Sequence, residues 1–248
     1  MSTHPLSVQL WTVRESLAAD PQATLTRLAE IGFTTVELFG FTERVAQLKG
    51  ALSDAGLRPS SAHAHLVGED LDTVFSAALE LGIPTVIEPM VAAEHWTTFE
   101  AVAATASALN AAAAKAADHE LTVGYHNHWW ELQNSIDGTP ALEVFAAQLD
   151  PAVVLEVDTY WATVGGVPAA GLLERLGERV QFIHVKDGDI SDDNTKQVAV
   201  GSGRMPVLDV LAAAPQALRV VELDDFTGDV FDALRDSVAY LTANGQRL

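Results

Sequence analysis

The stretch DPQATLTRLAEIGFTTVELF, residues 20–39, contains one complete helix–turn–strand unit. Asp20 is a helix-capping residue ahead of Pro21, which suits the first position of a helix, and an amphipathic run follows. Gly32 comes directly after that run, at the place where a left-handed residue commonly ends a helix. Residues 35–39 are short and apolar enough to form a buried strand. The segment thus predicts a helix followed by a strand, the unit from which α/β folds are built.

Strand-like and helix-like segments alternate eight times along the chain. The predicted strands are Ser7–Val13, Thr35–Phe39, Arg58–His65, Thr85–Pro89, Thr122–His126, Val153–Asp158, Val180–Val185 and Arg219–Leu223. The predicted helices include Pro21–Ile31, Thr42–Ala55, Leu71–Leu81, Trp96–Ala117 and Pro168–Leu176. Eight such units without a linker, in 248 residues, predict a single α/β domain over residues 1–248, a (β/α)8 TIM barrel. An open doubly wound sheet is the alternative, but no Gly-x-Gly-x-x-Gly motif follows the first strand, which favours the barrel.

The composition limits the classes of partner and cofactor. With 34 acidic and 14 basic residues, the chain has a net charge of −20, which would repel the phosphates of nucleic acids. No apolar run is long enough to span a membrane, and the N-terminus lacks the features of a signal peptide, so we expect a cytoplasmic protein without a membrane partner. Cysteine is absent, so any metal must be held by histidines and carboxylates. The sequence does not determine the oligomeric state and is compatible with a homo-oligomer.

Ionisable residues gather at the ends of the last four predicted strands. They are His126 and His128, Glu156 and Asp158, His184 and Lys186, and Glu222 and Asp224. Side chains alternate across a strand, so the members of each pair share one face, which in a closed barrel can be the interior. We predict that one divalent cation binds to four of them: His126, Asp158, His184 and Glu222. Such a cation would offset the cost of clustering these groups inside the barrel, and the ligand types suit Mn, Co, Zn, Fe or Mg without choosing among them.

Two further residues of these strands have roles that the pattern leaves open. Glu156 lies deeper than Asp158, and we expect it to pair with an interior histidine or lysine. Lys186 can contact the substrate or an oxyanion, or it can pair with Asp158 or Glu222.

The first half of the chain and the long loops supply candidate substrate contacts. His63 and His65 end the third strand on one face, and we expect them to contact substrate hydroxyl groups. Trp161 is expected to face the mouth and stack on a sugar ring, whereas the roles of the other tryptophans stay open. The connections 127–139 and 187–206 follow strands and should overhang the barrel mouth, and Arg204 in the second is a further candidate contact.

An ordered series of motifs resembles the sugar phosphate isomerase/epimerase superfamily, the xylose isomerase-like barrels. The series consists of Val8–Arg14, Leu28–Phe33, Val36–Leu38, Gly124–His128, Glu156–Trp161, His184–Asp187 and Gly201–Arg204. The resemblance implies one divalent metal held by Glu, Asp, His and Glu, to which Asp158, His184 and Glu222 correspond, while His126 replaces the first glutamate. The Gly-Tyr-His-Asn-His subgroup resembles barrels associated with keto-inositol dehydration and keto-glycoside elimination. The apurinic endonucleases share the fold, but Trp161 stands where they need a histidine.

These features predict a metal-dependent isomerase or epimerase that removes a proton next to a carbonyl of a sugar, keto-sugar or polyol. A keto-inositol or keto-glycoside dehydratase or lyase, and a catalytically inert sugar-binding barrel, are the alternatives. Glu222 or His128 is the expected base, and the expected acids are His63, His65 or Lys186. Because His126 replaces the first glutamate of the family's ligand set, epimerisation by two bases is the less favoured reaction.

Overall fold

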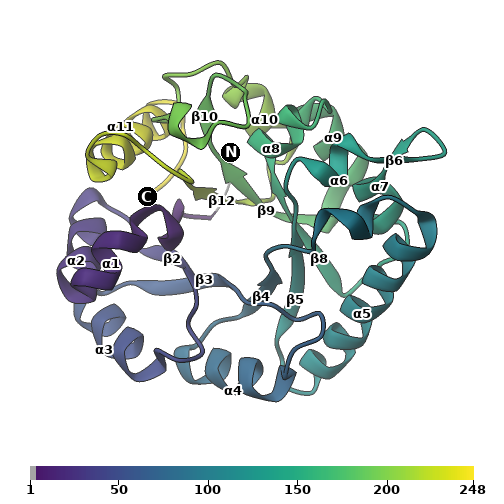
Figure 1. The fold of residues 1–248 in the computed structure, drawn as a ribbon. Coiled ribbons are helices and arrows are strands. Elements are labelled where there is room, and N and C mark those ends of the chain that lie inside the picture. Colours follow the sequence, from purple (N-terminus) through teal and green to yellow (C-terminus); the bar gives the residue numbers. More distant parts are fainter. Residues whose placement is uncertain (1–3) are drawn as a thin grey trace.

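Hydrogen bonds between the first and the last strand close the sheet into a barrel. Ser7 and Val8 pair in parallel with Val220 and Val221, and the strand order around the barrel is β1-β12-β9-β8-β5-β4-β3-β2. The computed structural model describes residues 4–248, and Figure 1 shows the helices in a ring around the strands. The barrel strands are β1 (Ser7–Gln9), β2 (Thr35–Phe39), β3 (Arg58–His63), β4 (Thr85–Glu88), β5 (Thr122–His126), β8 (Val153–Asp158), β9 (Val180–Val185) and β12 (Leu218–Val221). The predicted (β/α)8 TIM barrel is confirmed.

The helices lie outside the barrel or in the loops at its ends. They are α1 (Arg14–Ala19), α2 (Pro21–Ile31), α3 (Val45–Ala55), α4 (Leu71–Leu81), α5 (Phe99–Ala117), α6 (Trp130–Gln133), α7 (Ala141–Ala146), α8 (Thr159–Val164), α9 (Ala169–Leu176), α10 (Val207–Ala213) and α11 (Val230–Ala243). At α2 the predicted end signals operate as expected: the Asp20 carboxylate accepts a hydrogen bond from the Ala23 N–H at 3.0 Å, and Gly32 ends the helix with a φ of 115°. No helix among residues 4–248 is both long and apolar enough to cross a membrane.

Several predicted strands are too long, because the chain leaves the sheet before its apolar pattern ends. Residues Leu10–Val13 form a 3₁₀ helix directly after β1. β3 ends at His63 rather than His65, and the Glu88 carboxylate then accepts hydrogen bonds from the N–H groups of Leu66 and Val67. In the same way, β4 ends at Glu88 and β12 at Val221.

Three predicted helices also begin late. The stretches expected from Thr42, Trp96 and Pro168 become helical only at Val45, Phe99 and Ala169. Before α5, the residues Ala93–Trp96 form a separate 3₁₀ turn, and the Thr98 hydroxyl caps the helix by accepting a hydrogen bond from Ala101 N–H.

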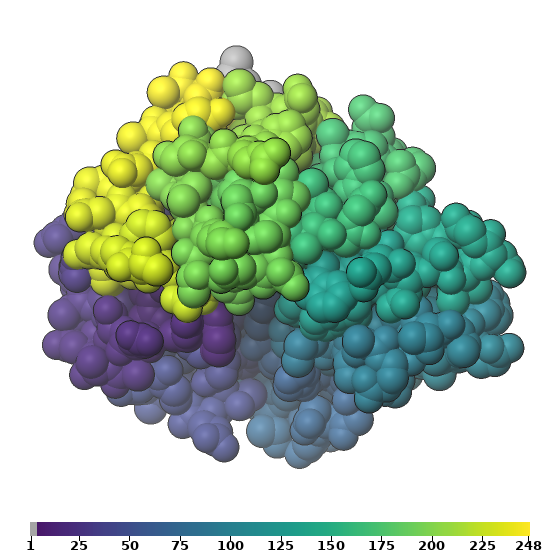
Figure 2. Space-filling view, turned by 45° about the horizontal axis from the view of Figure 1, so that its top comes forward, coloured from purple at the N-terminus to yellow at the C-terminus, as the bar shows by residue number. Residues whose placement is uncertain are grey.

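Both long loops are ordered at the carboxyl ends of the strands. The first contains α6 and the short hairpin β6 (Ser135–Ile136) and β7 (Thr139–Pro140), and the second contains the hairpin β10 (Asp187–Gly188) and β11 (Gln197–Val198). The buried Asp187 carboxylate fixes the second loop by accepting hydrogen bonds from four N–H groups, those of Gly188, Gly201, Gly203 and Met205. In Figure 2 the green part of the chain, which includes this loop, stands forward beside a hollow that purple and blue residues of the first half border.

Candidate functional site

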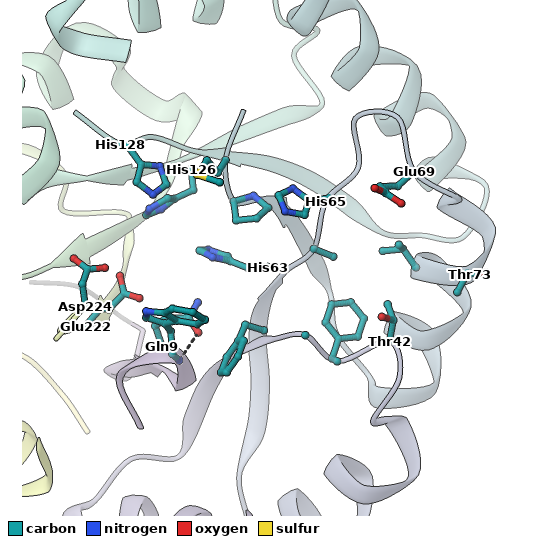
Figure 3. Close-up of a pocket in the computed structure, with 18 of the residues that line it drawn as sticks. Gln9, Thr42, His63, His65, Glu69, Thr73, His126, His128, Glu222 and Asp224 are labelled. Atoms are coloured by element: carbon teal, nitrogen blue, oxygen red, sulfur yellow. Dashed lines mark hydrogen bonds between the residues drawn. The ribbon is translucent and has the colours of Figure 1, made fainter. Parts of the chain in front are cut away.

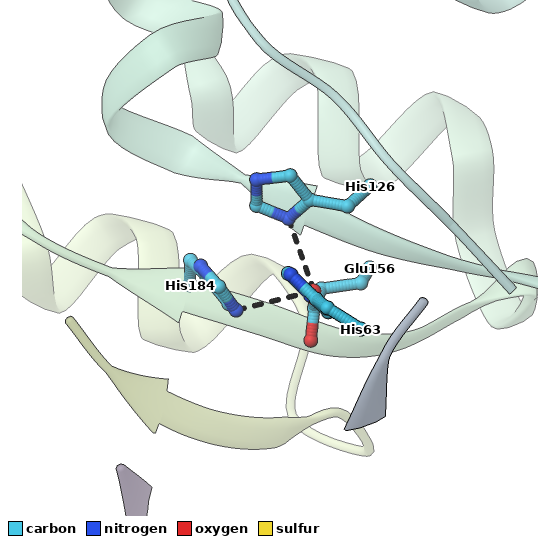
Figure 4. Close-up of side chains that lie close together, drawn as sticks. All are labelled: His63, His126, Glu156 and His184. Carbon is cyan, nitrogen blue, oxygen red and sulfur yellow. Dashed lines mark hydrogen bonds and ion pairs between the residues drawn. The ribbon is translucent and has the colours of Figure 1, made fainter. Parts of the chain in front are cut away.

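Five side chains form a cluster deep in the barrel, called here the deep cluster. It consists of Glu37 from β2, His63 from β3, His126 from β5, Glu156 from β8 and His184 from β9. The Glu156 Oε2 atom lies 2.6 Å from His63 Nε2, 3.0 Å from His126 Nδ1 and 3.1 Å from His184 Nε2, as Figure 4 shows. Glu156 therefore pairs with interior histidines, as expected from its place below Asp158.

The charges of the deep cluster balance one another. Burial alone would lower the pKa of His63, but the facing Glu37 and Glu156 carboxylates outweigh it and raise this pKa to about 10. The pKa of His184 is also raised, because Glu156 and Glu222 outweigh the effect of burial. Burial and the nearby His184 lower the pKa of His126. Without a cation, the carboxylates of Glu37 and Glu156 thus favour protonation of His63 and His184 but not of His126; a cation bound to His184 would take the place of its proton.

Glu37 is a site residue to which the sequence assigned no role. Its Oε1 atom accepts a hydrogen bond from the Gln9 amide at 2.8 Å and lies 2.8 Å from His184 Nε2. The opposite nitrogen of His184, Nδ1, lies 2.7 Å from Glu222 Oε2. A carboxylate behind a histidine fixes the ring and directs its other nitrogen, an arrangement common behind metal-binding histidines. The glutamate at the end of the second strand was the available signal, but its partner lies 147 positions away in the sequence.

A second group, called here the mouth cluster, lies closer to the opening and consists of Asp158, Lys186, Glu222 and Asp224. The Lys186 ammonium group is 2.8 Å from Asp158 Oδ2, 2.7 Å from Glu222 Oε2 and 2.8 Å from Asp224 Oδ2. Lys186 therefore pairs with both of the carboxylates that the sequence offered, and with a third. Burial raises the pKa of Asp158 to about 6, although Lys186 opposes the shift.

The four predicted metal ligands fall into two overlapping groups. Ligand atoms of Asp158, His184 and Glu222 all lie within 4.8 Å of one another, whereas His126 groups with His63, Glu156 and His184. His126 Nδ1 lies 3.0 Å from Glu156 Oε2 and its Nε2 lies 3.8 Å from Asp158 Oδ2, so the set of four stays a prediction.

The set of Asp158, His184 and Glu222 fits a divalent cation in its chemistry. Its donors are one imidazole and two carboxylates, which is a hard to borderline set. The Asp158 Oδ2 atom is buried and has no well-aligned hydrogen bond within residues 4–248; Lys186 Nζ at 2.8 Å and His184 Nδ1 at 4.0 Å compensate its charge. A cation at this position would satisfy that oxygen.

His128 differs from the other histidines of the mouth. Its ring stacks on Trp130 at a centroid distance of 4.5 Å, and its buried Nδ1 atom has no hydrogen-bond partner among the described residues. Burial and the nearby Lys186 lower its pKa to about 3, so the ring is neutral. Its backbone is fixed by Glu131, whose carboxylate accepts hydrogen bonds from His128 N–H at 3.0 Å and from the Tyr125 hydroxyl at 2.7 Å.

A cavity of about 700 Å³ opens above both clusters. Its polar end is formed by Gln9, His63, His126, His128, Glu222 and Asp224, and the remaining wall comes from the loops after β1 to β4 (Figure 3). Of the predicted substrate contacts, His63 and His65 line this cavity. His65 lies at the rim, with its side chain 55% exposed and its Nδ1 atom 2.8 Å from Glu88 Oε1.

Two predicted substrate contacts lie elsewhere. Trp161 is buried outside the cavity lining, because Asp158 caps α8 by accepting a hydrogen bond from Trp161 N–H and the ring then packs beside Tyr160. Arg204 is exposed on its loop and does not line the cavity. The tryptophan that does line the cavity is Trp11, which is 43% exposed.

Comparison with known proteins agrees with the fold. The profile of the family described as xylose isomerase-like TIM barrel matches residues 25–216. No curated protein sequence matches this chain. A sugar phosphate isomerase/epimerase from Parabacteroides distasonis is 23% identical, with a TM-score of 0.83 over 97% of this chain and 94% of its own.

Two other solved structures are similar in fold at lower identity. The probable 3-DHS dehydratase AsbF from Bacillus anthracis is 14% identical, with a TM-score of 0.76 over 96% of this chain and 99% of its own. The IOLI protein, solved with a zinc atom, is 13% identical, with a TM-score of 0.73 over 97% of each chain. At these identities the likeness shows the fold.

Proposed function

This chain belongs to the xylose isomerase-like TIM barrel family, and on that premise we propose that it is a metal-dependent enzyme that removes a proton next to the carbonyl of an unphosphorylated keto-sugar or keto-polyol. One observation carries the proposal: Glu222, whose carboxylate groups with Asp158 and His184, lines one end of a large cavity together with the imidazole of His128. Active sites of this barrel fold lie at that end of the strands.

Asp158, His184 and Glu222 would hold the cation, with His126 at its edge. A bound divalent cation supplies Lewis acidity, which stabilises negative charge on a carbonyl oxygen. The IOLI structure contains zinc on the same fold, which supports a metal here without identifying it. Glu37 holds the Nε2 side of His184, so that Nδ1 stays directed toward Glu222.

His128 is the side chain that is free to accept a proton. The imidazoles of His63, His65, His126 and His184 each lie within hydrogen-bonding distance of a carboxylate, whereas no carboxylate lies that close to His128 among residues 4–248. Glu222, the other expected base, is engaged by both His184 and Lys186. On geometry we therefore propose His128 as the proton acceptor and Glu222 as a ligand of the cation, although the pKa of His128, lowered to about 3 by burial and by Lys186, makes its imidazole a weak base.

The charge of the cavity disfavours a phosphorylated substrate. Among residues 4–248, no arginine or lysine lines the cavity, whereas Glu69, Asp70, Glu222 and Asp224 do. Phosphate recognition commonly uses arginine or lysine, and carboxylates would repel it.

A single free base favours elimination, dehydration or one-base isomerisation over C3 epimerisation. Epimerisation by two bases needs a second proton acceptor on the opposite face of the substrate, and His126 is held by Glu156. The probable dehydratase of similar fold is consistent with this reaction class.

A substrate panel tests this proposal. The Mn²⁺-loaded protein is incubated with methyl 3-keto-β-D-glucoside, with an inosose and with D-fructose, and the products are followed by NMR. We expect turnover of a keto-glycoside or inosose that stops when a chelator is added. Rapid C3 epimerisation of fructose alone would contradict the reaction class, and binding without turnover of any compound would instead indicate a sugar-binding barrel.

A further inference from the structure

The cavity extends well beyond the site of the proposed chemistry. Its volume of about 700 Å³ is within the range of about 300–1,000 Å³ that is typical for drug-sized ligands, whereas a free monosaccharide is a smaller molecule. The additional space lies over the loops after β1, β2, β3 and β4, away from Glu222 and Asp224.

This additional space has an aromatic wall. Trp11, Phe39, Phe41 and Met90 line it, and Trp11 and Met90 are each 43% exposed. Large apolar side chains that remain exposed in a cavity mark a place where a ligand can bury apolar surface.

The Trp11 ring contacts Phe39 and Arg14. Its backbone N–H donates to Gln9 Oε1 at 3.1 Å, and its ring makes an edge contact with Phe39 at a centroid distance of 5.2 Å. The Arg14 guanidinium lies 4.8 Å from the ring centroid, and it donates hydrogen bonds to the carbonyl oxygens of Trp11 and Asp224. The Gln9 amide also donates a hydrogen bond to Glu37, so the Gln9 side chain links Trp11 of the aromatic wall to the deep cluster.

The far edge of the cavity becomes polar again. Thr42, Glu69, Asp70 and Thr73 line it, and Figure 3 shows Thr42, Glu69 and Thr73 on the side opposite Glu222 and Asp224. Carboxylates and hydroxyl groups there can accept hydrogen bonds from a donor at the end of a bound molecule.

From this succession of polar, aromatic and polar surfaces we infer that the substrate is a keto-sugar carrying a flat aromatic group, an aryl keto-glycoside whose far edge bears a hydroxyl. The sugar lies at the polar end beside His128 and Glu222, the aryl group lies against Trp11 and Phe39, and the hydroxyl meets the rim at Glu69 and Thr73. This inference rests on the proposed function, since it places the reacting sugar at the proposed catalytic end.

Binding of unreactive glycosides tests the aryl site without requiring turnover. Titration calorimetry compares methyl, phenyl and 4-hydroxyphenyl β-D-glucosides with the wild type and with Trp11→Ala, Met90→Ala and Phe99→Ala. Phe99 is 52% exposed and lies outside the cavity lining, so its variant is the matched control. We expect the phenyl glucoside to bind about tenfold more tightly than the methyl glucoside, an effect of about 1.4 kcal/mol, with a further gain for 4-hydroxyphenyl.

The variants and a kinetic comparison make the outcomes distinguishable. Trp11→Ala should remove most of the preference for phenyl. Met90→Ala, which shortens a side chain that is 43% exposed, should reduce the preference, and Phe99→Ala should keep it. If methyl and phenyl glucosides bind equally to the wild type, the aryl site is wrong, even where methyl 3-keto-glucoside is turned over. If the phenyl preference depends on Trp11 but no keto-glycoside reacts, the aryl site stands and the proposed function fails.

Discussion

The two halves of the barrel mouth differ in how their side chains are satisfied. In the half formed by β5, β8, β9 and β12, charged groups bind one another at distances of 2.6–3.1 Å and little of their surface is exposed. In the half formed by β1 to β4, large apolar side chains such as Trp11 and Met90 stay exposed to the cavity. The difference separates two tasks. The half formed by β5, β8, β9 and β12 is suited to stabilising charge that develops on a substrate, and the half formed by β1 to β4 is suited to binding apolar surface.

The division is not complete, because Glu37 and His63 reach from the first four strands into the deep cluster.

The largest effect is expected for His184→Ala, which removes a residue shared by both groups of candidate metal ligands. We expect loss of metal binding and of activity, whereas the barrel should remain folded because each carboxylate keeps another partner: Glu37 keeps Gln9, Glu156 keeps His63 and Glu222 keeps Lys186. Metal analysis and circular dichroism on one sample measure both effects. An unfolded variant would indicate that the cluster serves stability rather than metal binding.

His128→Gln should reduce kcat by about 10²–10⁴-fold, the usual contribution of a general base. Metal content should stay at the wild-type level, since His128 lies in neither group of candidate ligands. His119→Gln, at the end of α5 and away from the mouth, is the control. A variant with unchanged kcat would return the role of base to Glu222.

Glu37→Gln tests the contact that joins the two halves. Loss of the carboxylate behind His184 should weaken metal affinity by about 10–100-fold, the range found for such partners of metal-binding histidines. Glu88→Gln changes a carboxylate of the same half that binds a loop instead, and metal titration should show no comparable loss for it. Equal metal affinity of Glu37→Gln and the wild type would show that His184 needs no orientation.

A further effect concerns stability and pH. Burial raises the pKa of Glu131 to about 8 in the folded protein, above its ordinary value near 4.5. The folded state therefore holds a proton that the unfolded state releases, and stability from this group is lost as the pH rises from about 4.5 to 8. In Glu131→Gln this loss should be absent, so the Tm should fall less than that of the wild type between pH 5 and pH 8. Parallel Tm curves would contradict the raised pKa.

The sequence predicted one half of the mouth better than the other, for physical reasons. Alternation along strands placed His126, Asp158, His184 and Glu222 inside the barrel, because the residue period of a strand is fixed. Alternation does not determine which of these side chains meet, since this depends on the register of neighbouring strands: β5 pairs with β8 so that His126 stands beside Glu156. His126 Nδ1 therefore lies 3.0 Å from Glu156 Oε2, a contact that alternation along a single strand does not reveal.

The aromatic wall was the less predictable half. Trp11 and Trp161 both follow strands, and the pattern favoured Trp161. Which tryptophan faces the cavity depends on the first turn after each strand. Trp11 lies on a 3₁₀ helix that leaves its ring exposed, whereas Trp161 lies on α8 with its ring buried. Such turn geometry depends on local hydrogen bonds, here those of Gln9 and Asp158, which spacing does not reveal.

Deuterium exchange gives the most direct test of the central claim that the charged half of the mouth removes a proton next to a carbonyl with the help of a metal. Methyl 3-keto-β-D-glucoside is incubated in D₂O with the Mn²⁺-loaded protein, with the chelator-treated protein and with His128→Gln, and the C–H signals next to the carbonyl are followed by NMR. We expect those signals to be lost with the metal-loaded wild type, through exchange or elimination, at a rate well above that of the other two samples. Equal rates in all three samples, or loss of signal that persists without metal, would contradict the account.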